Sequence, residues 1–259
     1  MPPTVVSPLY WNYWANVIYI LGMFGYLTID SANYLFAGFQ NDLSIFIYVF
    51  LAILFALSAI LYAIDWYVYA VKLREDENEP IHYRAELIAC MFQNVGCYLY
   101  LLGATLAFHQ VKYMKTILLL NFFAILAFLT ESSLIFLGWR MALRRQGTSN
   151  PKRGCVAQDV CMWAHLLYFI GNVIYLCSTS LAYRFYVDFN VTYPNGVVIL
   201  QIFGDLIYLL DAYLYYECWK RDKQEYDANT ERQNLVKLNV VKQLSTENFA
   251  NDMKIDSDN

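Results

Sequence analysis

Six long apolar segments dominate this chain and restrict it to one architecture. They lie near residues 14–36, 44–69, 86–109, 116–139, 159–183 and 196–218. A run of about 20 apolar residues is the length that crosses a hydrocarbon core roughly 30 Å thick. Hydrophobic residues make up 59% of the 259 residues and charged residues only 15%. The sequence therefore predicts an all-α, multipass membrane protein with six transmembrane helices, placed in the plasma membrane or an endomembrane.

Short motifs recur along these segments. Residues 163–171 repeat the pattern of residues 14–22, with tryptophan, tyrosine and glycine at matching places. A second motif lies near the end of the second, fourth and sixth segments. It reads Ser58-Ala59-x-Leu61 before Trp66, Glu131-Ser132-x-Leu134 before Trp139, and Asp211-Ala212-x-Leu214 before Trp219. Recurring motifs indicate one supersecondary unit used several times. We predict a transmembrane domain over residues 1–219, built from three two-helix repeats at 14–69, 86–139 and 159–218.

Basic residues cluster at alternate connections between the segments. Arg140, Arg144, Arg145, Lys152 and Arg153 lie between the fourth and fifth segments, whereas the connection at 40–44 has no basic residue. Connections rich in Lys and Arg stay on the cytoplasmic side of a membrane. The pattern predicts that both termini are cytoplasmic.

The composition changes sharply after the last apolar segment. Residues 220–259 contain seven basic and eight acidic side chains and few aromatic ones. Such segments cannot bury enough apolar surface to fold on their own. We predict a cytoplasmic, largely disordered tail that binds a protein partner, and the architecture is also compatible with a homo-oligomer. The basic clusters indicate topology and contact with anionic lipid, so no nucleic-acid partner is expected.

A polar stripe follows one face of the fifth segment. His165, Tyr168, Asn172, Tyr175 and Thr179 are separated by steps of three and four residues, which places them on one helix face. The first segment has Asn16, Tyr19, Met23, Tyr26 and Asp30 at the equivalent positions. Unsatisfied polar groups are costly in lipid, so both stripes should face the interior. Polar side chains of this kind often only hold helices together, at roughly 0.6 kcal/mol for each hydrogen bond.

Three acidic residues inside the apolar segments point to a function. Glu131 and Asp211 occupy the same motif position, eight residues before a tryptophan, and Asp205 lies on the same segment as Asp211. That position is roughly 12 Å in from the interface, close to the midplane of the membrane. An ionised acid there costs at least about 2.5 kcal/mol, so such groups are paired, protonated or in contact with water. Asp65 lies nearer the interface, where reaching out to water explains it.

Motifs for enzymatic catalysis are missing from the sequence. It contains no H-E-x-x-H, C-x-x-C, G-x-S-x-G or Walker-type motif. The three histidines, His82, His109 and His165, are spread over different segments, which argues against a metal cluster. We expect no enzymatic activity, metal ion or other cofactor.

Two classes of function remain. In the first, the protein moves a small cation, a proton or a small solute through a polar interior, with Glu131 and Asp211 as charge carriers or ligands and Asp205, His165 and Asn172 in support. In the second, it is an accessory or scaffolding membrane subunit that binds a partner through its helices and its tail. Repeat-built bundles with polar midplane groups favour the first class.

Overall fold

The protein is almost entirely helical over the residues that its computed structural model describes, which are 9–36, 42–71, 80–146, 160–191 and 194–257. The helices are α1 (Tyr10–Leu35), α2 (Asp42–Asp65), α4 (Pro80–Leu106), α5 (Gln110–Gln146), α6 (Val160–Phe189) and α7 (Asn195–Ser257). A π-helical segment, Trp66–Val71, continues α2, and a 3-10 turn, Ala107–His109, joins α4 to α5. No strand occurs in these ranges.

Six helices in the described residues are long and apolar enough to cross a membrane. Their spans are Tyr10–Leu35, Leu43–Val68, Leu87–His109, Lys112–Gly138, Val160–Phe189 and Asn195–Arg232. The prediction of an all-α chain with six helices of membrane-spanning length is therefore confirmed. The three-repeat organisation and the orientation of the termini stay predictions.

The chain divides into two compact units, Met1–Cys218 and Trp219–Asn259. In the second unit α7 continues to Ser257. That residues 220–259 form a largely disordered cytoplasmic tail stays a prediction.

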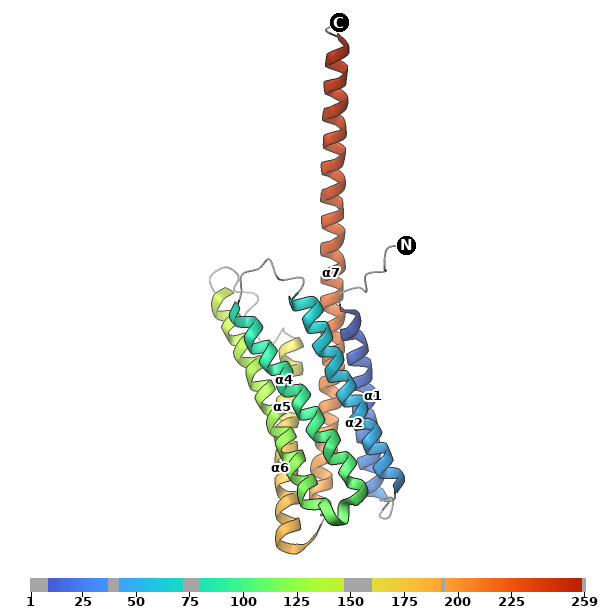
Figure 1. Ribbon diagram of the computed structural model, residues 1–259, viewed down its shortest axis with the longest axis vertical. Helices are drawn as coiled ribbons and strands as arrows, with labels where there is room; N and C mark the ends of the chain where they lie inside the picture. Colours follow the sequence, from blue (N-terminus) through green and yellow to red (C-terminus); the bar gives the residue numbers. More distant parts are fainter. Residues whose placement is uncertain (1–8, 37–41, 72–79, 147–159, 192–193, 258–259) are drawn as a thin grey trace. The chain divides into compact units, whose positions relative to one another are not determined.

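In the first unit the six helices form a closed ring in chain order. Helix α1 packs against α2, α2 against α4, α4 against α5, and α5 against α6 (Figure 1). Helix α6 contacts α7 through the hydroxyl of Tyr215 and the ring of His165. The ring closes where Tyr19 of α1 binds Asp211 of α7. Short connections between successive helices favour this antiparallel arrangement of neighbours.

Large apolar side chains lie exposed along the helices of this unit. Phe24, Phe46, Phe123, Phe203 and Leu210 are each more than half exposed. Soluble monomers rarely expose contiguous apolar patches larger than a few hundred Å². Such a surface suits a lipid bilayer, where apolar side chains lose nothing by facing outward.

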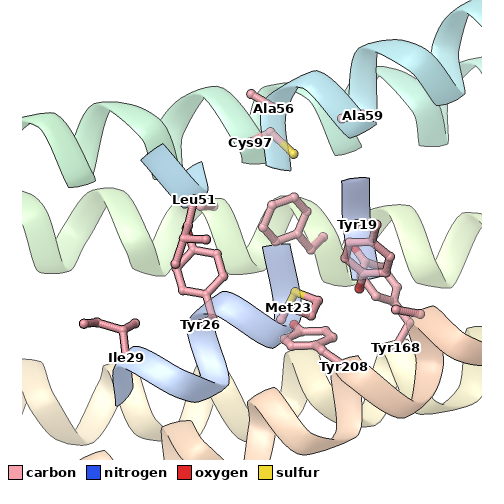
Figure 2. Close-up of a cluster of buried hydrophobic side chains, with 13 residues drawn as sticks. Tyr19, Met23, Tyr26, Ile29, Leu51, Ala56, Ala59, Cys97, Tyr168 and Tyr208 are labelled. Atoms are coloured by element: carbon pink, nitrogen blue, oxygen red, sulfur yellow. The ribbon is translucent and has the colours of Figure 1, made fainter. Parts of the chain in front are cut away.

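The interior of the ring is packed largely with aromatic side chains. Figure 2 shows Tyr19, Met23 and Tyr26 of α1 together with Tyr168 of α6 and Tyr208 of α7, all of them buried. Aromatic rings bury a large area, and their hydroxyl groups need hydrogen-bond partners when they leave water. The core is therefore apolar in bulk but contains many hydroxyl groups.

Close approach of α6 and α7 depends on a glycine. A Cβ atom at Gly171 would lie 2.8 Å from Cε1 of Tyr208, which is closer than van der Waals contact allows. The Tyr208 ring cannot move aside easily, because its hydroxyl donates a hydrogen bond of 2.7 Å to Asn172 Oδ1. At Gly22, the matching position on α1, nothing lies within 4 Å of such an atom.

These two glycines make a matched test of the packing. We expect Gly171→Ala to lower the free energy of unfolding by about 1–3 kcal/mol, because the added methyl group overpacks against Tyr208. Gly22→Ala should be neutral or stabilising by up to about 1 kcal/mol, because alanine favours a helix. Thermal unfolding of both purified variants checks this. Equal melting temperatures for the two would contradict the described packing of α6 on α7.

Candidate functional site

A cavity of about 360 Å³ lies inside the ring, towards the end where α1 begins. All six helices contribute residues to its lining. The polar side chains other than tyrosine that line it are Asn12, Ser58, Asp65, Gln93, Glu131 and His165. We call this the first cavity. Its size and its few polar groups in an aromatic wall are typical of a small-molecule site.

A second cavity of about 150 Å³ lies inside the ring towards the opposite end. It is also lined by residues of all six helices. Its polar side chains other than tyrosine are Asp30, Asn33, Ser44, Asn121, Thr179 and Gln201. The ring therefore contains one cavity with polar lining residues near each of its ends.

A layer of buried residues lies between the two cavities along the helices, and we call it the central layer. It consists of Met23, Tyr26, Leu51, Ala124, Phe128, Asn172, Asp205, Tyr208 and Asp211. On α5, Asn121 lines the second cavity and Glu131 lines the first. Those two residues are about 15 Å apart along the helix axis. On α4, Cys97 of the first cavity and Tyr100 of the second are only about 4.5 Å apart along the axis, so the central layer is less than one turn thick there and nearly three turns thick at α5. It contains three polar side chains that the sequence predicts to be functional.

Four buried carboxyl groups each accept a hydrogen bond from a tyrosine on another helix. The donors and acceptors are Tyr48 and Asp30, Tyr168 and Glu131, Tyr175 and Asp205, and Tyr19 and Asp211. The distance from the hydroxyl to the carboxyl oxygen is 2.9 Å at Glu131 and 3.0 Å at Asp211. Within the described chain, none of these four acids pairs with a lysine or an arginine. Neutral hydroxyl groups stabilise them in place of basic partners.

Two of these acids retain hydrogen-bonding capacity. Asp205 Oδ2 and Asp211 Oδ1 are buried and have no hydrogen-bond partner among the described residues. A proton or a polar ligand could satisfy the remaining oxygens.

Asn172 and His165 are positioned by tyrosines of α7. The hydroxyl of Tyr208 donates to Asn172 Oδ1 at 2.7 Å, and Asn172 Nδ2 donates to the carbonyl oxygen of Tyr168 at 3.0 Å. Tyr215 and His165 Nδ1 form a hydrogen bond of 2.6 Å in which the donor depends on the tautomer of the imidazole ring. Asn172 is therefore held on both sides of its amide, while His165 lines the first cavity.

The five sequence-predicted site residues do not form one cluster. Glu131 and His165 line the first cavity, whereas Asn172, Asp205 and Asp211 are fully buried in the central layer. The structure thus places all five along the interior of the ring, at two different depths.

Asp30 and Asp65 are not among the residues that the sequence predicts to be functional. Asp30 belongs to the polar stripe of the first segment, and that stripe was the only signal for it. Asp65 was predicted to reach out to water, but it is only 5% exposed and lines the first cavity. It accepts hydrogen bonds of 3.2 Å from the backbone nitrogen and Nδ2 of Asn12. Because Asn12 is 53 residues away in the sequence, no local pattern could have revealed this contact.

The described residues contain no group of three histidine, cysteine, aspartate or glutamate side chains that could hold a metal ion. Comparison with protein-family models, with curated proteins and with solved structures finds no match to this chain. Functional inference therefore depends on the cavities and on the hydrogen-bonded acids.

Removal of one tyrosine hydroxyl tests the role of these hydrogen bonds. Tyr19→Phe leaves the buried Asp211 without its donor, so we expect the free energy of unfolding to fall by about 1–3 kcal/mol. Tyr213→Phe is the control, because Tyr213 lies on the same helix as Asp211 but is 56% exposed. Thermal unfolding of the two variants measures the difference. A loss in Tyr213→Phe as large as that in Tyr19→Phe would refute this role.

Proposed function

We propose that the protein moves a small cation, a proton or a small solute between its two cavities, across the central layer, and that it is not an enzyme. One observation carries this proposal: two cavities, each with several polar side chains in its lining, lie in the same helical ring, on opposite sides of a buried layer that contains Asp205 and Asp211. A substrate entering either cavity would have to pass this layer to reach the other. Transporters commonly bind substrate near the midplane, between repeated helical units.

The free-energy cost of placing acids inside the membrane supports the proposal. An ionised acid near the midplane of a membrane costs at least about 2.5 kcal/mol, and such residues mark ion and proton pathways. If packing alone were required, neutral side chains would form the same contacts at lower cost. The oxygens of Asp205 and Asp211 that lack a partner among the described residues are suited to accept a proton or a cation in transit.

We also infer that the ring is built from three repeats with both termini cytoplasmic. Tyr19 and Tyr168 occupy equivalent places in the first and third repeats. Each donates to the acid at the second-motif position of the preceding repeat in cyclic order, Asp211 for Tyr19 and Glu131 for Tyr168. In this orientation the first cavity lies on the cytoplasmic side.

The proposal is tested by neutralising two acids. We expect Glu131→Gln/Asp211→Asn to abolish proton or monovalent-cation flux in proteoliposomes while the variant still folds, because amides keep the shape of the acids but cannot carry charge. Asp188→Asn is the control, since Asp188 is exposed and paired with Arg184 outside the cavities. Unchanged flux in the double variant would refute the proposal.

The helical second unit, Trp219–Asn259, favours a second candidate function. Its side chains at Lys220, Arg221, Asp222 and Lys223 are exposed, which suits contact with a protein partner. In this alternative the protein is an accessory or scaffolding subunit, and the buried acids only stabilise helix packing.

Deletion of residues 222–259 tests the alternative. An accessory subunit should lose at least about tenfold of its affinity for a co-purifying partner, because a charged helix that forms the interface is removed. A transport protein should keep its flux after the same deletion. Affinity purification and flux assays on the truncated chain separate the two outcomes, and unchanged capture of partners would contradict the alternative.

A further inference from the structure

The first cavity combines aromatic and acidic groups without a lysine or an arginine side chain among the described residues. Its aromatic lining residues are Tyr19, Phe55, Tyr62, Trp66, Tyr168 and Tyr215. Asp65 and Glu131 are the two acids in the lining, and no lysine or arginine is among the described residues that line it. Aromatic rings attract cations through the negative charge of their faces, and the attraction grows when water is excluded.

Glu131 has one oxygen available for a ligand. It is 5% exposed, and its Oε2 accepts the hydrogen bond from Tyr168. Its Oε1 accepts no hydrogen bond within the described part of the chain. Asp65, in contrast, has both oxygens bonded to Asn12. Glu131 is therefore the acid in this cavity that lacks a partner for half of its carboxylate.

We propose that the first cavity binds a small organic ammonium ion. The charged nitrogen of this ion pairs with Glu131, and its carbon atoms contact the surrounding aromatic rings. This inference rests on the proposed function and names the substrate class of that transport. A bound ammonium supplies the positive charge that no lysine or arginine of the lining supplies.

Other ligand classes fit the lining less well. An anion would meet two acids and no basic side chain apart from His165, whose Nδ1 is already bonded to Tyr215. A bare metal ion would find no group of three suitable ligands among the described residues. A neutral apolar ligand would leave Glu131 buried without compensation, which is unfavourable.

The proposed repeats explain why the cavity is where it is. Cys90 occupies the place in the second repeat that Tyr19 and Tyr168 occupy in the other two, and Ser58 occupies the place of Asp211 and Glu131. Both small side chains line the first cavity. The cavity thus occupies the position where a third pair of tyrosine and acid would lie, and Cys90→Tyr should fill part of it.

Calorimetric titration of the full-length protein tests the proposal, with phenethylammonium as the probe and 2-phenylethanol as its neutral counterpart. We expect saturable binding of phenethylammonium that is at least about tenfold tighter than binding of 2-phenylethanol, because only the ammonium pairs with Glu131. Equal affinity for the two compounds, or no saturable binding of the ammonium, would overturn the proposal. This comparison uses the unaltered protein and does not depend on the folding of a variant.

Two variants locate the binding site. Glu131→Gln should weaken phenethylammonium binding by at least about tenfold, whereas Asp188→Asn, which removes an exposed acid, should leave it unchanged. Cys90→Tyr should reduce binding by occupying the cavity, with Cys90→Ser as its control of nearly equal volume. Full affinity in both Glu131→Gln and Cys90→Tyr would overturn the assignment to this cavity.

Flux measurements in proteoliposomes, made beside the binding titration, separate this inference from the proposed function. Proton flux without ammonium binding would overturn the inference and leave the proposed function standing. Ammonium binding without any flux in proteoliposomes would support the binding site and contradict the transport proposal.

Discussion

The arrangement of the ring depends on hydrogen bonds from tyrosine hydroxyl groups to buried acids. In each of the four pairs the tyrosine and the acid come from different helices, and the bond from Tyr19 to Asp211 closes the ring between its first and last helices. Acids this far from water need donors, because an unsatisfied carboxyl group in an apolar interior is costly. Tyrosine supplies a donor without adding charge, so the acids are held in place without being neutralised. That combination links the helices and leaves carboxyl groups without a basic partner inside the ring.

Side-chain size then decides where the interior is filled and where it is open. The contact of Gly171 with the Tyr208 ring brings α6 and α7 close together and completes the central layer. Small residues such as Ser58 and Cys90 leave space on the other side, and the first cavity forms there. Larger side chains at these two positions would fill part of that space. The small volumes of Ser58 and Cys90 are therefore one reason why the interior stays open there.

Much of the candidate site follows from helical periodicity. The stripe from His165 to Thr179 predicts an inward face on α6, and Tyr168, Asn172 and Thr179 are buried there. The motif position shared by Glu131 and Asp211 likewise predicts two buried acids. Periodicity cannot show which residues meet across the ring. The partners of Asp211 and Glu131 are 192 and 37 residues away from them in the sequence, and Asp65 was misjudged for the same reason.

The sequence by itself determined the all-α fold with six helices long and apolar enough to cross a membrane, because segments of this length and apolar content satisfy their backbone groups in lipid as helices. It also determined which helix faces turn inward, since polar groups avoid lipid. Only the tertiary structure decided which tyrosine binds which acid, and that the predicted residues divide between a cavity and a buried layer. Those outcomes depend on the distances between helices and on the volumes of facing side chains, such as Gly171 with Tyr208. Both are set by the packing of the whole ring and by no single segment.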